Sequence, residues 1–334
     1  PINTAAIACN APPPFKALGG YHAALDTLNT LPGATSWVAR HLCPRNDTTF
    51  DTAVDRMFYT RRNGRRIDAI REQILQWRAD RAIDAHEEAC LLAPLLYQAC
   101  YRANTSGVFK GFHKGWGGQT GTALYRIATD LELTPSIFFD NGQANRVERA
   151  DAHTLVSQLA SQGPADVVYL DPPYNQHPYA SNYHVLNSIT LWDKPELPPH
   201  ITPGTKAAIR TNWRTERRSA YNYRAEATNA YQSLLAVTNA RFILTSYSTD
   251  GLILLEDLVS ANCNRGRVSA ECQSYKRYRV SRQRFSHKPM NVEFVLICDT
   301  RRPGSESVEA VCDHIRRAEA QALADHPETS TRES

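Results

Sequence analysis

Apolar residues recur at helical spacing through the first half of this chain. Four apolar side chains, each three or four positions from the next, lie between charged neighbours, and they predict a core-facing helix: Ile67, Ile70, Ile74 and Trp77. A second helical stretch covers 83–102, where Pro94 is expected to kink or split the helix. The first half of the chain is therefore expected to be mainly helical.

Short runs of β-branched and aromatic residues alternate with helical stretches in the second half. Strands are expected over 166–170, 241–247 and 292–298, and helices over 218–237, from Asp250, and through Leu155 and Leu159. A linker and an amphipathic helix with a polar tail are expected from Arg301 onward. Strands that alternate with helices predict a layered α/β sheet.

The composition is typical of a globular protein. Of the 334 residues, 42% are hydrophobic, which is ample for a core. No apolar run approaches the roughly 20 residues of a membrane-spanning helix, and the start Pro1-Ile2-Asn3 lacks the pattern of a secretion signal. We therefore expect a cytoplasmic protein that does not contact a membrane. The eight cysteines form no Cys-x-x-Cys pair, so we expect reduced thiols and no metal site.

Arginine dominates the basic residues, because only seven of the 38 are lysine, and the net charge is +4. Guanidinium groups suit phosphates and guanine edges. A coding bias toward arginine explains the same count equally well. The charge by itself therefore assigns no partner.

The tetrapeptide Asp171-Pro172-Pro173-Tyr174 directly follows 166–170, which is expected to be a buried strand. In open α/β sheets, ligands bind where strands end. Two successive prolines fix two φ angles and remove two backbone donors, so the turn presents rigid carbonyl acceptors. An ordinary strand-to-loop turn explains the tetrapeptide about equally well, because Asp and Pro are common turn residues.

The functional interpretation concerns a planar exocyclic amine, such as that of adenine. Two acceptors that hold its two hydrogens favour the tetrahedral shape that attack on a methyl group requires. The Asp171 carboxylate and the Pro172 carbonyl fit these roles. Tyr174 is placed to stack on a base extruded from the duplex, as this chemistry requires.

Five stretches of the chain resemble, in one order, the DNA adenine methyltransferases, specifically the Dam-like group that includes the FokI-type modification enzymes. They are 56–72, 103–109, 171–184, 244–253, and 275–278 with 293–297. The resemblance implies a Rossmann-like S-adenosylmethionine-dependent methyltransferase sheet with an inserted, mainly helical recognition region. It also implies S-adenosylmethionine as methyl donor, adenine in double-stranded DNA as acceptor, and a role in restriction-modification.

The resemblance also implies roles for particular residues. Asp171, Pro172, Pro173 and Tyr174 form the catalytic turn, and Asp151 and Asp171 are expected to bind the donor. A helix N-cap is the alternative for Asp151. DNA contacts are expected from Tyr179, Asn182, Tyr183, Lys110, Lys114, Lys276, Arg277 and Tyr278, with His113 and Trp116 as further candidates. The alternatives are a polar helix start for the residues after the turn and a solvated loop for Tyr275 to Tyr278.

The same resemblance divides the chain into a remnant of the N-terminal catalytic part (1–40), a target-recognition region (41–135), the catalytic methyltransferase domain (136–300) and a C-terminal helix and tail (301–334). The family's glycine-containing donor motifs do not occur in this sequence. The sheet is therefore expected to be incomplete at its N-terminus, and the chain alone is expected to bind donor weakly. Either the chain is a fragment of a longer gene product, or a separate N-terminal polypeptide completes the donor site.

Three functions are compatible with these features. The leading hypothesis is site-specific methylation of adenine in DNA. The second is a catalytically incomplete DNA-binding remnant or a subunit of a split methyltransferase. The third is methylation of RNA or protein amines, since this type of tetrapeptide also serves other planar nitrogens.

Overall fold

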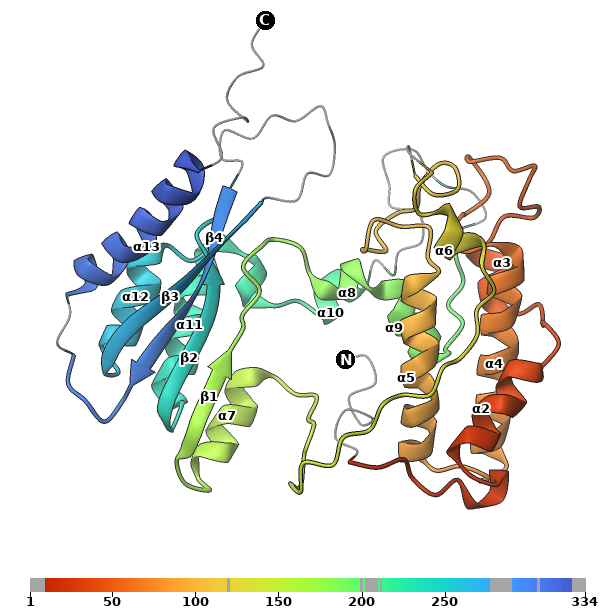
Figure 1. The fold of residues 1–334 in the computed structure, drawn as a ribbon, viewed down its shortest axis with the longest axis horizontal. Coiled ribbons are helices and arrows are strands. Elements are labelled where there is room, and N and C mark those ends of the chain that lie inside the picture. Colours follow the sequence, from red (N-terminus) through yellow and green to blue (C-terminus); the bar gives the residue numbers. More distant parts are fainter. Residues whose placement is uncertain are drawn as a thin grey trace, which may run out of the picture. The chain divides into compact units, whose positions relative to one another are not determined.

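Two compact units make up the chain (Figure 1). One comprises 1–149 and 179–217, and the other comprises 150–178 and 218–334. The computed structural model describes residues 10–118, 121–198, 201, 210, 212–276, 290–304 and 307–325. The four functional regions expected from the sequence remain a prediction.

The first unit is helical. Its elements are η1 (Lys16–Leu18), α2 (Tyr21–Thr30), α3 (Trp37–His41), α4 (Arg61–Ala79), α5 (Ala85–Tyr101), α6 (Leu124–Ala128), α8 (Tyr179–Asn182), α9 (His184–Leu191) and α10 (Trp213–Glu216). The apolar spacing of α4 is confirmed, because Ile67, Ile70, Ile74 and Trp77 all lie in the core of this unit. None of the helices within the described ranges is long and apolar enough to cross a membrane.

Helix α5 continues through Pro94, so this proline does not split the helix, and the alternative of a kink stays a prediction. A proline cannot donate to the carbonyl four residues earlier, which here belongs to Cys90. The Tyr21 hydroxyl donates to that carbonyl instead, at 3.5 Å. A capping box of Asp84 and Glu87 fixes the start of the helix. A partner from α2 thus replaces the missing bond within α5.

The second unit is an α/β layer. Its elements are α7 (Ala152–Ala160), β1 (Ala165–Leu170), η2 (Ala220–Asn222), α11 (Arg224–Val237), β2 (Ala240–Ser248), α12 (Leu255–Cys263), β3 (Arg267–Lys276), β4 (Met290–Asp299) and α13 (Val308–Ala324). The strand order is β1-β2-β4-β3, with β1 parallel to β2 and the other pairs antiparallel. The expected layered sheet is confirmed. Strand β3 was missed, and α11 and α12 begin later than expected.

Helices cover one face of this sheet, where Ile243 of β2 and Leu296 of β4 pack in one core with α11, α12 and α13. The opposite face carries Tyr169, Leu244 and Ile297, which pair side by side across β1, β2 and β4. Tyr169 is 57% exposed, and the other two are half-buried.

Strand β1 was expected to be buried, but Leu170 is its one buried residue, so that expectation was wrong. Its neighbour Val167 is 54% exposed. Among the described residues, β2 is the strand that pairs with β1, and the outer edge of β1 has no strand beside it. The exposure of β1 therefore follows from its position at the edge of a half-covered sheet.

Candidate active site

The predicted catalytic turn lies where β1 ends. Strands β1 and β2 are parallel, and Leu170 pairs with Thr245. Asp171 therefore lies at the C-terminal end of these two strands. Pro172 is buried, whereas Asp171 is exposed. The Asp171 carboxylate accepts no hydrogen bond and forms no ion pair with the described residues. It is therefore available to a substrate.

Tyr174 contacts residues at the end of β2 and just after it. The backbone N–H of Leu252 donates to the Tyr174 carbonyl at 3.2 Å. The ring of Tyr174 lies edge-on to that of buried Tyr247, with 6.1 Å between the centroids. The Tyr247 hydroxyl in turn accepts from the Ile253 N–H at 3.0 Å. The stretch 244–253, noted for its resemblance, thus braces the catalytic turn.

A second contact holds the chain just beyond Tyr174. The side-chain amide of buried Asn222 donates to the Asn175 carbonyl at 2.7 Å. The Asn175 side chain accepts from the backbone N–H of His177 at 2.9 Å. The chain is therefore held at Tyr174 and at Asn175, by residues 78 and 47 positions away in the sequence.

Asp151 caps helix α7, as the structural alternative for this residue predicted. Its carboxylate accepts from the Thr154 N–H at 3.0 Å and from the Thr154 hydroxyl at 3.3 Å. Burial, and then the negative charge of Asp151, raise the pKa of Tyr221 to about 12. Asp151 itself is exposed, and its contact with the donor remains a prediction.

Helix α8 follows the catalytic turn in sequence and belongs to the helical unit. Tyr179 is exposed, and its ring centroid lies 6.0 Å from that of half-buried Tyr183. Asn182 is buried, and its backbone carbonyl accepts from the Phe109 N–H at 2.7 Å. His184 contacts the Phe109 carbonyl through its ring, also at 2.7 Å. Tyr179 is thus presented at the surface, whereas Asn182 anchors the start of a glycine-rich stretch, 107–118.

One buried side chain, Asn104, organises that glycine-rich stretch. Its amide nitrogen contacts the carbonyls of Met57, His113 and Gly115 at 3.0–3.1 Å. Its amide oxygen accepts from the Gly117 N–H at 3.2 Å. Sequence reasoning missed this role, although Asn104 lies in a stretch that showed the resemblance.

The same loop presents Lys114 at the surface, while Lys110 is half-buried. The Trp116 indole N–H donates to the Asp47 carbonyl at 2.8 Å, so Trp116 holds the loop to the unit. The contact of these two lysines with DNA remains a prediction.

We expect Asn104→Ala to destabilise the helical unit by about 1–3 kcal/mol, because buried carbonyls would lose their donor. Denaturant unfolding and hydrogen exchange at the Gly117 amide measure the effect. Asn145→Ala is the matched control, since Asn145 is exposed. Equal unfolding of the two variants would show that Asn104 does not hold the loop.

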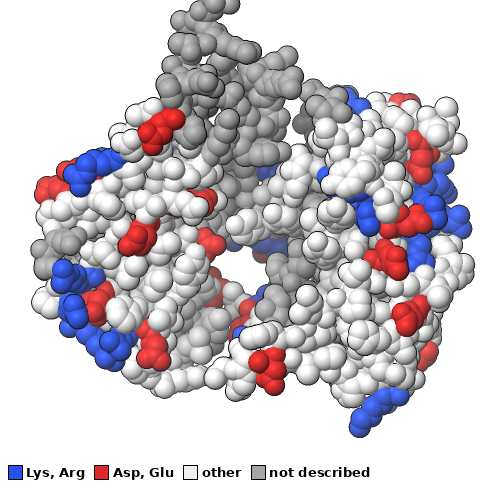
Figure 2. Space-filling model, in the orientation of Figure 1, with Lys and Arg blue, Asp and Glu red and all other residues white. Residues whose placement is uncertain are grey.

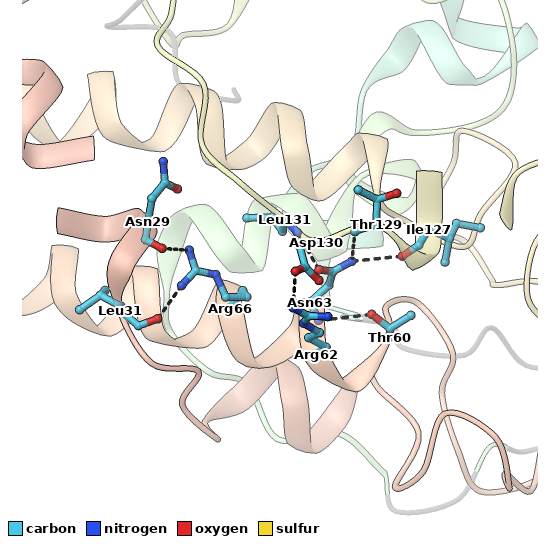
Figure 3. A network of polar contacts seen from close by, with 10 residues as sticks. All are labelled: Asn29, Leu31, Thr60, Arg62, Asn63, Arg66, Ile127, Thr129, Asp130 and Leu131. Carbon is cyan, nitrogen blue, oxygen red and sulfur yellow. Dashed lines mark hydrogen bonds and ion pairs between the residues drawn. The ribbon is translucent and has the colours of Figure 1, made fainter. Parts of the chain in front are cut away.

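A second asparagine fixes the segment that follows this loop (Figure 3). The Asn63 amide donates to the carbonyls of Ile127 and Thr129, and its oxygen accepts from the Leu131 N–H at 2.8 Å. Arg66, one helical turn on, donates to three carbonyls at the end of α2. Helix α4 thus ties α2 and the segment after α6 together.

The third group of predicted DNA contacts lies at the end of β3. Lys276 is the last residue of β3 and pairs with Met290, so Tyr275 and Lys276 belong to a strand rather than to the expected loop. Arg277 and Tyr278 lie outside the described residues. Among the described residues on the face shown in Figure 2, Lys and Arg side chains lie among Asp and Glu side chains rather than in one continuous basic patch. The described residues include no cluster of His, Cys, Asp or Glu suited to a metal ion.

Comparison with protein families identifies the chain. The model of the D12 class N6 adenine-specific DNA methyltransferase family matches residues 43–238. The chain belongs to this family. The match includes the predicted catalytic turn, Asn63, Asn104 and α8. No solved structure matches the chain significantly.

Relatives of this D12 class methyltransferase include named modification enzymes. Type II methyltransferase M.NlaIII of Neisseria lactamica is 29% identical over 271 residues, which are 81% of this chain and 73% of that enzyme. Type II methyltransferase M.FokI of Planomicrobium okeanokoites is 32% identical over 70% of this chain, and modification methylase StsI of Streptococcus sanguinis is 31% identical over 59%. The matches cover only 33% and 27% of these last two enzymes. The family resemblance found in the sequence is confirmed, and a mere DNA-binding remnant is not favoured.

Proposed function

We propose that this D12 class chain methylates the exocyclic N6 of adenine in double-stranded DNA, as the modification enzyme of a restriction-modification system. The observation that carries the proposal is the exposed Asp171 carboxylate, on a turn at the end of a parallel strand that is held at Tyr174 and Asn175. The donor, S-adenosylmethionine, supplies the methyl group. The N6 lone pair forms the new bond to carbon as the carbon–sulfur bond breaks, and N6 then releases a proton.

Three residues of the turn have distinct tasks in this proposal. The Asp171 carboxylate and the Pro172 carbonyl accept the two N6 hydrogens and favour the tetrahedral amine. The ring of Tyr174 stacks on the extruded adenine. Its contacts with Tyr247 and Leu252 support this task, because a braced ring loses little freedom when the base arrives.

The donor side requires a further polypeptide segment, in our proposal a strand that adds in parallel to the outer edge of β1. Parallel strands are normally covered on both faces, yet Val167 and Tyr169 of β1 are more than half exposed. An open strand edge also presents unpaired backbone groups. The added strand would complete a Rossmann-like sheet and bring the donor next to Asp171, with Asp151 as a further donor contact.

The segment before α7 supports the same proposal. Ile137 is 97% exposed and Phe139 is 78% exposed, whereas Phe138 between them packs against the core of the helical unit. Alternation with a period of two is typical of a strand. These two apolar side chains are accordingly candidates for burial when the sheet is completed.

Calorimetric titration with S-adenosylmethionine tests the donor side. The chain as given is compared with the chain extended by the residues encoded immediately upstream of Pro1. We expect the extended chain to bind S-adenosylmethionine tightly and the chain as given to bind it weakly. We expect Tyr169→Lys to weaken binding by the extended chain. Tyr97→Lys, at a tyrosine that is 66% exposed in the helical unit, is the matched control. Equally tight binding by the unextended chain would overturn the proposal.

A further inference from the structure

Two arginine side chains contact one tryptophan ring in the helical unit. The Arg217 guanidinium carbon lies 3.7 Å from the centroid of the Trp213 indole, and that of Arg210 lies 4.2 Å away. Trp213 is buried. Contacts at these distances are cation–π interactions, which hold each guanidinium against the ring.

The two arginines differ in their acidic partners. Arg210 forms an ion pair with Asp193 at 2.6 Å. Arg217 forms no ion pair with the described residues, and Glu216, the nearest acid in sequence, accepts from the Asn212 amide at 3.0 Å. The half-buried Arg217 guanidinium is thus positioned by the indole without an ion pair among the described residues, although the negative charges of Glu216 and Asp193 act on it.

A third cation adds to this cluster. Arg149 is exposed and forms no ion pair with the described residues. Burial, and then the positive charges of Arg149 and Arg210, lower the pKa of Arg217. Cations that repel one another in this way are stabilised when an anion binds among them.

The cluster lies beside the helix that follows the catalytic turn. Helix α10 begins at Trp213 and packs against α8, the helix that presents Tyr179. An anion held at Arg217 would therefore lie near residues that are predicted to contact the target nucleotide.

We propose that Arg217, held against Trp213, binds a phosphodiester group of the DNA backbone, with Arg149 as a second contact. Guanidinium forks match the geometry of phosphate oxygens. Contacts of this kind position the duplex and do not read its sequence. The inference rests on the proposed function, because it requires DNA as the substrate.

The salt dependence of DNA binding tests this site. The wild-type protein, Arg217→Gln, Arg149→Gln and the double variant are titrated with a short mixed-sequence duplex at several salt concentrations. Each lost phosphate contact is expected to reduce the slope of log affinity against log salt by about 0.9. At low salt we expect Arg217→Gln to bind about tenfold more weakly. Arg217→Lys, which keeps the charge, is expected to retain most of the wild-type slope.

Arg301→Gln is the matched control. Asp299 pairs with Phe242 near the start of β2, so exposed Arg301 lies near the N-terminal end of β2, whereas the predicted catalytic turn lies at the C-terminal end of the parallel strands. Binding with the wild-type slope by Arg217→Gln and by the double variant would overturn the phosphate site and leave the proposed function intact. Methyl transfer that persists in Asp171→Ala would instead overturn the proposed function, whatever the slopes.

Discussion

Asp171→Ala is expected to lower methyl transfer to DNA by about 100- to 1,000-fold or more, the usual effect of removing one group that stabilises a transition state. The carboxylate is exposed, accepts no hydrogen bond from the described residues and lies at the end of β1. Its loss therefore removes an acceptor for N6 and leaves the surrounding packing intact. The measurement is the transfer of labelled methyl groups to DNA. It uses the chain as given if that chain labels DNA, and otherwise the chain extended upstream of Pro1.

Asp166→Ala is the matched control for this experiment, because Asp166 is an exposed aspartate of the same strand. We expect it to transfer methyl groups at the wild-type rate. Asp171→Ala should also bind duplex DNA as the wild type does. Equal transfer by the two variants would show that Asp171 does not act on the amine.

Gly251→Ala is expected to destabilise the α/β unit by about 1–3 kcal/mol, as overpacking against a buried side chain does. A Cβ atom at this position would clash with Cε1 of Tyr247, a residue that is 2% exposed and whose ring cannot move away freely. Displacement of that ring would also disturb its contact with Tyr174. Denaturant unfolding measures the loss of stability, and methyl transfer is expected to fall with it.

Gly111→Ala serves as the control for this substitution, because a Cβ atom there would meet no atom within 4 Å and its φ is not positive. An unfolding midpoint of Gly251→Ala equal to that of Gly111→Ala would contradict the tight packing of Tyr247 against the turn.

The strands that the sequence predicted are those whose own composition is typical of a strand. β1, β2 and β4 are rich in β-branched and aromatic residues. Strand β3 alternates small apolar residues with polar and charged ones, such as Ala270 and Glu271, and was missed because its pairing with β4 defines it. The continuity of α5 was unpredictable for a similar reason, since the Tyr21 hydroxyl that compensates for Pro94 comes from another helix.

The candidate site shows the same division between local and distant causes. Asp171 to Tyr174 were found because a strand, an acid and two prolines are adjacent in the sequence. Asn222 and Leu252, which hold this turn, act through hydrogen bonds to residues 47 and 78 positions away. No local pattern marks such partners, although Leu252 lies in a stretch that resembles the family.

The central claim is that this chain holds adenine for methylation at N6 through Asp171. It is tested most directly by mass spectrometry of the nucleosides in DNA from cells that lack adenine methylation of their own and express the protein extended upstream of Pro1. We predict N6-methyldeoxyadenosine with the wild type and none above background with Asp171→Ala. Methyl groups on cytosine instead of adenine, or equal N6-methyldeoxyadenosine from both proteins, would contradict the claim.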